Sequence, residues 1–359
     1  MNNWKQSRVT DRLGLRFPIV QGPFGGGLSS VELCSTVSAS GGLGSFGAHH
    51  LNGAEIIATA AQIRANTSKP FALNLWIPFD GSDVPTYSNS EITQLSAQWE
   101  PFFEELQLPL PEKPVRFSPD YTDQIDGILK ARPAVFSFVY GIPSADILTQ
   151  CKQLGITTLG TATSIAEAVA LERAGVDMVV ASGFEAGGHR VSFLQPAEDA
   201  LTGGLSLIPQ IADSIHIPVI AAGGIADGRG IAAARVLGAE AVQIGTAFLA
   251  CEESGTSALH KQALFSEEAR HTGLTRVFSG RLARGIRNRL MHEGQRRPIA
   301  PYPVQNWLMG QLKRAAIEAE RSDLMSLWCG QSAALLQHQQ TPALINSLVE
   351  ETDRLLQQV

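Results

Sequence analysis

The sequence has few cysteines, no long apolar run and no excess of positive charge. Its four cysteines lie far apart and form no Cys-x-x-Cys pair or Cys/His cluster, which argues against a disulfide framework and a zinc site. No apolar stretch is long enough to cross a bilayer. The first 14 residues lack the apolar segment of a signal peptide. We therefore expect a cytoplasmic protein that needs no metal and contacts no membrane.

The charge balance also limits the class of partner. The formal net charge is −6 over 359 residues, so no general attraction to nucleic acid or to an anionic membrane is expected. The composition, 44% hydrophobic and 17% charged, is typical of a soluble globular protein with a large core. A short basic run at residues 281–297 is the local exception, and we interpret it as a solvated or interdomain surface, with attraction of an anionic substrate as the alternative.

Eight short apolar runs recur along the first two thirds of the chain, with helical patterns between them. Most of the runs are continuous rather than alternating, which is typical of buried parallel strands. Eight βα units within about 250 residues favour an α/β fold of the TIM (β/α)8 barrel type. A doubly wound sheet is the alternative, since it shares the same alternation. The predicted strands are residues 18–21, 43–48, 71–77, 134–141, 157–162, 178–183, 218–225 and 241–248.

The pattern suggests three parts. Residues 1–254 form the predicted barrel, with a proline-rich insertion or long βα loop at residues 78–120. Residues 255–330 form a smaller, mainly helical domain over the barrel mouth, and residues 331–359 form a C-terminal helical segment that returns to the barrel. Two barrel helices carry apparent capping boxes, Ser29 with Glu32 and Ser164 with Glu167.

Glycine-rich segments follow several predicted strands. The match to Gly-x-Gly-x-x-Gly at residues 42–47 follows a helix and enters a strand, so it does not fit a dinucleotide fingerprint. The segment QGPFGGG at 21–27 ends the first strand, and its glycines allow a flat ligand to approach the backbone closely. A flexible loop is the competing interpretation there. Asn74 is polar within an apolar strand, which favours a ligand contact over the alternative of a hydrogen bond to a neighbouring loop.

The loops after the seventh and eighth predicted strands suggest a phosphate site. Gly223 and Gly224 end one strand, and Gly245 and Thr246 end the other. In TIM barrels these loops often hold phosphate through backbone N–H groups and a helix N-terminus. We therefore predict a cofactor that carries a phosphate.

The stretch ASGFEAGGHR at 181–190 ends the sixth predicted strand, which places Glu185, His189 and Arg190 at the barrel mouth. A histidine exchanges protons near neutral pH, so His189 is the predicted general base or acid. His49 and His50 follow the second strand and could line the mouth. The remaining histidines, His260 among them, are interpreted as surface or packing residues.

Taken in order, the segments QGPFGGG, FALNLWIP, ASGFEAGGHR, AAGGIADGRGI and VQIGTAF resemble those of the nitronate monooxygenases, formerly called 2-nitropropane dioxygenases. The resemblance covers about residues 15–290. It implies an FMN-binding TIM barrel that oxidatively denitrifies alkyl nitronates, and neutral nitroalkanes as well, with O₂ to carbonyl compounds and nitrite. An NAD(P)H-dependent FMN reductase of the quinone or enoyl type is the alternative function, and a binding module without turnover is a third.

The resemblance also implies the partners, a small-molecule nitronate or nitroalkane and O₂. The expected assembly is a monomer or homodimer. The resemblance further assigns roles to individual residues. His189 matches the catalytic histidine of the family. Ser182 stands where the family often has Gln, and Gly22-Pro23-Phe24 stands in place of a common Ala-Pro-Met. The loop analysis and the resemblance together give the cofactor-binding residues Gly22, Pro23, Phe24, Asn74, Ser182, Gly187, Gly223, Gly224, Gln243, Ile244, Gly245 and Thr246.

Overall fold

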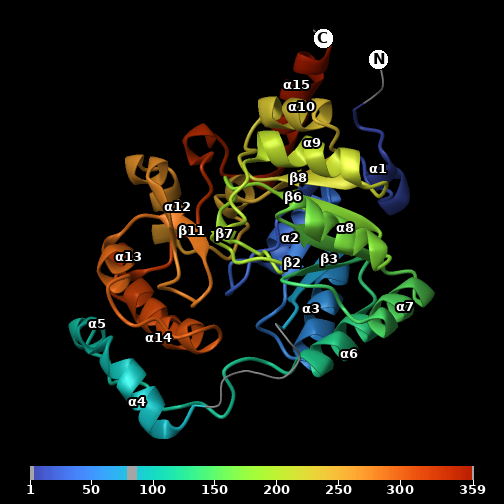
Figure 1. Cartoon of the computed structure of the whole chain (residues 1–359). Helices are drawn as coiled ribbons and strands as arrows, with labels where there is room; N and C mark the ends of the chain where they lie inside the picture. The colour runs from blue at the N-terminus through green and yellow to red at the C-terminus, as the bar shows by residue number, and fades with distance from the viewer. Residues whose placement is uncertain (1–3, 79–86, 358–359) are drawn as a thin grey trace.

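The computed structural model describes residues 4–78 and 87–357, and the eight barrel strands lie within them. Eight parallel strands form one sheet in the order β1-β9-β8-β6-β5-β4-β3-β2 (Figure 1). A parallel bridge between Val20 and Leu43 joins the two ends of the sheet, so the sheet is closed and the doubly wound alternative is wrong. The strands are β1 (Ile19–Gln21), β2 (Gly44–Gly47), β3 (Phe71–Trp76), β4 (Val135–Val139), β5 (Thr157–Ala162), β6 (Met178–Ser182), β8 (Val219–Ala222) and β9 (Ala241–Ile244).

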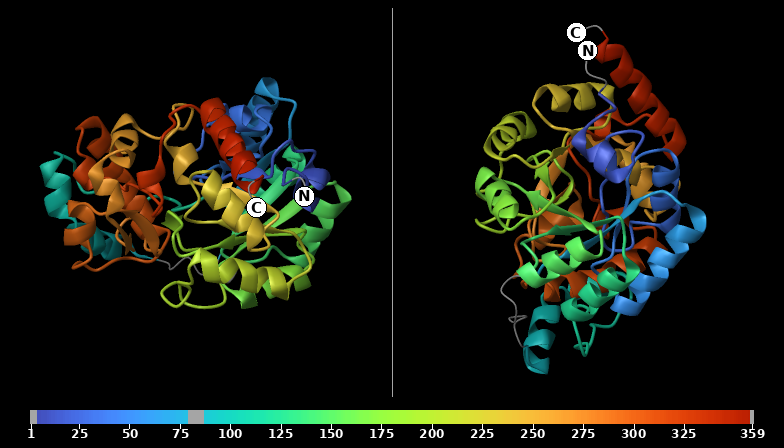
Figure 2. Two further views of the ribbon diagram at one scale, coloured as in Figure 1. Left: turned by 90° about the horizontal axis from the view of Figure 1, so that it is seen from above. Right: turned by 90° about the vertical axis from the view of Figure 1, so that its right-hand side faces the viewer.

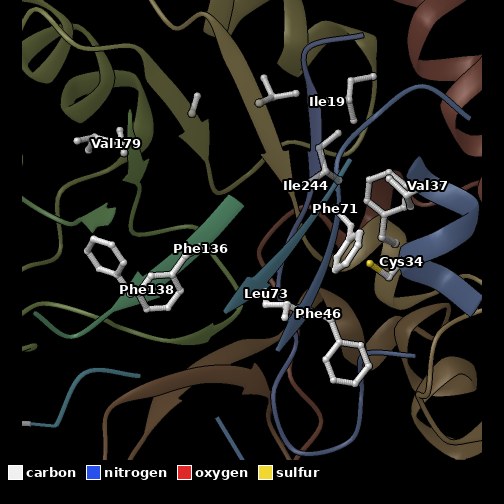
Figure 3. Packing of buried hydrophobic residues seen from close by; sticks show 14 of the residues in the cluster. Ile19, Cys34, Val37, Phe46, Phe71, Leu73, Phe136, Phe138, Val179 and Ile244 are labelled. Carbon is white, nitrogen blue, oxygen red and sulfur yellow. The ribbon is translucent and has the colours of Figure 1, made fainter. Parts of the chain in front are cut away.

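The strands are apolar on both faces because each face is buried. Alternate residues belong to two hydrophobic clusters: Val180 packs inside the barrel, whereas Val179 packs toward the helices. Figure 3 shows the outer layer, where Phe71 and Ile244 lie near Cys34 and Val37 of α2 (Val31–Ala39). The inner cluster also contains Val9 and Leu13 of α1 (Arg8–Leu13), so this helix closes the amino ends of the strands.

A ring of helices surrounds the sheet, and its last member comes from the end of the chain. The helix that directly follows β9, α11 (Thr246–Leu249), is only four residues long. The C-terminal helix α15 (Thr341–Leu356) packs against α10 and α2 and completes the ring (Figures 1 and 2). The other helices of the ring are α3 (Gly53–Asn66), α6 (Tyr121–Ala131), α7 (Ala145–Gln153), α8 (Ile165–Arg173), α9 (Gly204–Ser214) and α10 (Gly228–Val236).

One predicted helix cap is wrong and the other is partly right. The N-cap of α2 is Ser30, whose side chain accepts from the Leu33 amide, and Ser29 lies one residue outside the helix. The N-cap of α8 is Ser164, as predicted. Its partner Glu167 accepts instead from the amide and hydroxyl of Thr163, and from the amide of Phe193 in the loop after β6. This buried carboxylate therefore ties two loops at the barrel mouth.

A second hydrophobic cluster lies beside the barrel mouth and is called here the second core. Leu264, Met291 and Leu312 contribute to it from three helices. A three-stranded antiparallel sheet in the order β10-β11-β7 accompanies these helices, so this part of the chain is not purely helical. The division of the chain at residues 254 and 330 stays a prediction. The elements are α12 (Ala258–Leu264), α13 (Arg289–Gly294), α14 (Val304–Glu318), β7 (Gly188–His189), β10 (Thr272–Thr275) and β11 (Ala283–Ile286).

The proline-rich segment 78–120 joins β3 to α6 and contributes to the second core; its residues 79–86 lie outside the described residues. It contains α4 (Asn89–Ala97) and α5 (Glu100–Glu105), which lie at the side of the molecule away from the barrel (Figures 1 and 2). Phe102 and Phe103 are 1% exposed and belong to the second core. An ion pair of 2.6 Å between Glu105 and Arg321 fixes α5 on its polar side.

Close packing of α2 against β2 gives a test of the barrel. A Cβ atom on Gly44 would lie 1.9 Å from the carbonyl oxygen of Cys34, so Gly44→Ala forces the backbones of β2 and α2 apart. We expect a loss of about 3 kcal/mol in the free energy of unfolding, measured by urea denaturation. Gly310→Ala in α14 is the matched control, since nothing lies within 4 Å of its added methyl group. Equal stability of the two variants would contradict the packing described.

Candidate active site

A cavity of about 660 Å³ lies at the carboxyl ends of the barrel strands, between the barrel and the second core. Residues after β1, within β3, at the end of β6 and after β9 line its barrel side. Phe278, Met309 and Trp328 line it from the second core, and Tyr302 lines it from just before α14. The predicted residues that line it are His189, Gly22, Pro23, Phe24, Asn74, Ser182, Gly187, Gly223, Gly224, Gln243, Gly245 and Thr246.

Ile244 is the exception among the predicted site residues. Its side chain is fully buried in the cluster between the sheet and the helices, so it does not reach the cavity. Strand alternation explains this placement, because Gln243 and Ile244 point to opposite faces of β9. The carbonyl of Ile244 does serve the site, since it accepts a 2.8 Å hydrogen bond from the amide of Gly22.

Ser29 holds the loop after β1 against the end of β2. Its hydroxyl donates to the Phe24 carbonyl at 2.9 Å and accepts from the amides of Phe24 and Gly47, each at 3.1 Å. A Cβ atom on Gly47 would lie 2.2 Å from the Phe24 oxygen, so glycine is required for this approach. The residue that the sequence suggested as a helix cap therefore positions the glycine-rich loop beside the cavity.

Both predicted phosphate loops contribute backbone amides to the cavity wall. Gly223 and Gly224 have φ of 102° and 72°, a conformation that favours glycine. In the described part of the chain, the amides of Gly223, Gly224 and Gly245 make no hydrogen bond with another protein group. Three donors at one end of the cavity suit an anionic oxygen group.

The N-terminus of α10 does not belong to this donor set, whereas Gly245 is the N-cap of α11. The Asp227 side chain accepts from the amides of Arg229 and Gly230. The carboxylate of Glu351, on α15, accepts from the amide of Gly228 at 2.9 Å. These two carboxylates occupy the free donors of α10, so an anion has to be held by the preceding loop instead.

Residues 329–332 complete the cavity wall and were not predicted. The amide of Gly330 donates to the Thr246 hydroxyl at 2.9 Å, which leaves the hydroxyl proton of Thr246 available to a ligand. A Cβ atom on Gly187 would lie 2.5 Å from the Gly330 nitrogen. Gly187 therefore allows the loop after β6 to meet this segment. No local sequence pattern marks Gly330, because its role depends on contacts with residues more than 80 positions away.

The segment that carries His189 is a strand rather than a free turn. Gly188 and His189 form β7, which pairs with β11 so that His189 lies opposite Ala283. The next amide, of Arg190, donates to the Leu282 carbonyl at 2.8 Å. Arg190 is 1% exposed, and its guanidinium donates to the carbonyls of Ser182, Gly183 and Ala200. Arg190 thus braces the loop, and the catalytic prediction rests on His189.

Glu185, the third polar residue of this stretch, also has a structural role. Both of its carboxylate oxygens lie 2.9 Å from the amide of Gly204, at the start of α9. Its carbonyl accepts from the amide of Gln331 at 3.0 Å. Glu185 therefore joins the loop after β6 to α9 and to residues 329–332.

The imidazole of His189 is fixed by a hydrogen bond and by two aromatic rings. Its Nε2 lies 2.7 Å from the hydroxyl of Ser279. The rings of Trp76 and Trp328 lie 4.8 and 5.2 Å from it, centroid to centroid. Burial, with a smaller contribution from the charge of Arg281, lowers the pKa of His189 to about 3. The ring is therefore neutral at neutral pH and carries one unprotonated nitrogen.

Besides His50, which is exposed, two further histidines line the cavity. His49 stacks on Trp76 with centroids 4.0 Å apart and 7° between the planes, and burial lowers its pKa well below the usual range. His260, which we had interpreted as a surface or packing residue, is 1% exposed, and its Nε2 lies 3.0 Å from the carbonyl oxygen of Trp328. Burial lowers the pKa of His260 to about 3. The cavity wall thus holds three neutral imidazoles.

The basic run at 281–297 is not simply a solvated surface. The guanidinium of Arg281 lies 3.8 Å from the ring centroid of Tyr140 at the barrel mouth and 4.2 Å from that of Tyr302, just before α14. Arg284 is 3% exposed and donates to the carbonyl of Phe184, so a solvated position is wrong for it. These cations join the two walls of the cavity.

Within residues 4–78 and 87–357, no helix is long and apolar enough to cross a membrane. The same residues contain no group of three or more His, Cys, Asp or Glu side chains arranged to hold a metal ion. All four cysteines are free and buried, so no disulfide contributes to the site.

A closed (β/α)8 barrel with a histidine and a ligand-sized cavity at the carboxyl ends of its strands defines a TIM-barrel enzyme. The family model described as nitronate monooxygenase matches residues 6–351. A probable nitronate monooxygenase of Staphylococcus haemolyticus is 40% identical over 98% of this chain and 99% of its own length. The chain belongs to the nitronate monooxygenase family and is an oxidoreductase, which confirms the resemblance seen in the sequence.

Other relatives agree with this assignment. A probable nitronate monooxygenase of Staphylococcus aureus is 38% identical over 99% of both chains. Among solved structures, nitroalkane oxidase from Streptomyces ansochromogenes superposes with a TM-score of 0.88 at 34% identity, covering 97% of this chain and 98% of its own. FabK from Thermotoga maritima superposes with a TM-score of 0.76 at 28% identity, covering 98% of each chain.

Buried neutral histidines make stability depend on pH. The pKa of His260 is about 3 in the folded protein and 6.5 when unperturbed, so below pH 6.5 the unfolded chain binds a proton that the folded chain does not. Stability is therefore lost as the pH falls from 6.5 toward 3. Between pH 7 and 5, the unfolding free energy of the wild type should fall by about 2 kcal/mol more than that of His260→Gln.

Urea denaturation at the two pH values measures this difference. His271→Gln, at an exposed histidine, is the matched control. Equal pH dependence of the wild type and His260→Gln would show that His260 is charged, or free to become charged, in the folded protein.

Proposed function

We propose that this protein binds FMN and carries out the oxidative denitrification of alkyl nitronates, and of neutral nitroalkanes, with O₂ to carbonyl compounds and nitrite. The observation that carries this proposal is the cavity itself. It combines three free loop amides, on Gly223, Gly224 and Gly245, with a neutral, hydrogen-bonded His189. The free amides suit the phosphate of a cofactor, and the proton acceptor beside them suits a substrate with an acidic C–H bond.

The residues present fit FMN. The cavity of about 660 Å³ is within the range of small-molecule sites. The amides of Gly223, Gly224 and Gly245 would hold the phosphate, with the Thr246 hydroxyl beside them. Gly22, Pro23, Phe24, Asn74, Ser182, Gly187 and Gln243 would line the rest of the cofactor.

The chemistry divides between cofactor and protein. When bound, FMN supplies the redox chemistry that carries electrons from the nitronate to O₂. The protein supplies the pocket, in which Trp76 and Trp328 limit where a small substrate can lie. His189 accepts the proton from the carbon of a neutral nitroalkane. The nearby charge of Arg281 favours the anionic nitronate over the neutral acid.

The relatives support the same reaction class. The solved nitroalkane oxidase is named for oxidation of a nitroalkane, and the two Staphylococcus relatives are named probable nitronate monooxygenases. The likeness to FabK gives weaker support to the alternative of an NAD(P)H-dependent FMN reductase. Quinone or enoyl reduction would use the same barrel and the same cofactor site.

We also propose the remaining assignments made from the sequence. The barrel comprises residues 1–254, the smaller domain residues 255–330, and the returning helical segment residues 331–359. The protein acts in the cytoplasm as a monomer or homodimer and has neither nucleic acid nor membrane as a partner. The second core and the position of α15 against α10 and α2 support the division of the chain.

Anaerobic mixing of the purified flavoprotein with NADH, NADPH or an alkyl nitronate distinguishes the two enzyme functions. We expect the flavin absorbance to bleach with the nitronate and to change slowly with either nicotinamide. Rapid bleaching by a nicotinamide alone would favour the reductase. A purified protein that takes up no FMN would contradict both functions.

Replacement of His189 by Asn tests its role as base. The variant should retain FMN, because His189 supplies none of the three loop amides, and should release nitrite from a neutral nitroalkane about 100-fold more slowly. The flavin spectrum checks cofactor content, and His271→Asn, at an exposed histidine, is the matched control. Full activity of His189→Asn on the neutral nitroalkane would exclude the base assignment.

A further inference from the structure

We propose that Ser279 is a positioning residue, which holds His189 with its proton on Nε2 and leaves the lone pair of Nδ1 open to the cavity. The proposal rests on the proposed function, because it concerns the proton transfer that His189 would perform there. It assigns a role in that reaction to a side chain from the second core, 90 positions away from the histidine in sequence.

Ser279 is buried and its hydrogen bonds are confined to two residues. The side chain is 1% exposed. Its hydroxyl oxygen lies 2.7 Å from His189 Nε2, 3.2 Å from the carbonyl oxygen of Arg281 and 3.3 Å from the amide nitrogen of Arg281. Water is largely excluded, so these three neighbours decide where the hydroxyl proton points.

Counting donors and acceptors selects one arrangement. A serine hydroxyl has one proton to donate and two lone pairs that accept. If it donates to the Arg281 carbonyl, it can accept from the Arg281 amide and from a protonated Nε2, and all three contacts are hydrogen bonds. If it donates to an unprotonated Nε2 instead, the contact with the Arg281 carbonyl is lost. The first arrangement is favoured because it satisfies every buried group.

The same arrangement leaves Nδ1 of His189 as the acceptor. Among the described residues, no protein group forms a hydrogen bond with Nδ1 of His189, and it is not among the buried polar atoms that lack a partner. His189 lines the cavity, so this nitrogen is the one that a ligand can reach. Pairing of His189 with Ala283 fixes the backbone, and Trp76 and Trp328 restrict rotation of the ring.

The proton transfer then has a defined direction. The C–H bond beside the nitro group breaks, its electron pair stays on the substrate as the nitronate, and a new N–H bond forms at Nδ1. The imidazolium and the nitronate appear together as an ion pair, which offsets the repulsion between His189 and Arg281. His49, whose pKa is itself lowered in part by His189, also faces the ring and is neutral. A substrate supplied as the nitronate does not need this step.

The tautomer can be measured directly by ¹⁵N NMR of the FMN-loaded protein labelled at histidine. His189→Asn identifies the signals of His189 by their loss. We expect the wild-type ring to be protonated on Nε2 alone, and Ser279→Ala to show a changed or mixed tautomer. Ser279→Thr, which keeps the hydroxyl, should restore the wild-type signals. A wild-type ring protonated on Nδ1, or an unchanged spectrum in Ser279→Ala, would overturn the proposal.

Kinetics with two forms of one substrate give the second readout. Ser279→Ala should lower kcat/KM by about 10- to 100-fold for the neutral nitroalkane and by less than about twofold for the preformed nitronate. An equal loss for both forms would overturn the positioning role. Ser96→Ala is the matched control, since Ser96 is also 1% exposed and lies outside the cavity. If no nitro compound is turned over, the proposed function fails, while the NMR result still decides the tautomer.

Discussion

The pairing of β7 with β11 is the interaction on which the candidate site depends. Gly188 and His189, which form β7, join a sheet whose other two strands, β10 and β11, accompany the second core. This contact joins the loop after β6 to β11, so a residue of the barrel loop and a strand beside the second core are held together. Without it, His189 would lie on a free loop, and the cavity would have no fixed histidine.

The same constraint explains the electrostatics of the cavity. Because the second core covers the carboxyl ends of the strands, His49, His189 and His260 are shielded from water and their pKa values are lowered. The amides of Gly223, Gly224 and Gly245, which also line the cavity, have no protein partner among the described residues. The cavity therefore combines donors that suit an anionic group with neutral imidazoles among aromatic rings.

Much of the barrel could be predicted from the sequence, because each strand is a local apolar run buried on both faces. The barrel side of the site followed as well, since parallel strands bring their carboxyl ends to one edge. Residues such as Ser279 and Gly330 could not be predicted, because long-range contacts alone bring them to the cavity. Nothing in the local sequence shows that the amides at the N-terminus of α10 are occupied. The carboxylate of Glu351, 123 positions later, accepts a hydrogen bond from the Gly228 amide there. The capping-box spacing of Ser29 and Glu32 pointed to the wrong serine, because packing places Ser29 against Phe24 and Gly47 and leaves Ser30 to cap α2.

Titration of the apoprotein with FMN and with riboflavin tests most directly whether the loops after β8 and β9 form a phosphate site for a flavin. The two ligands share the same ring system and differ in the phosphate. Free amides that bind this group should make FMN bind about 100-fold or more tightly than riboflavin, measured by quenching of flavin fluorescence. Equal affinity for the two ligands, or failure to bind FMN, would contradict the site described.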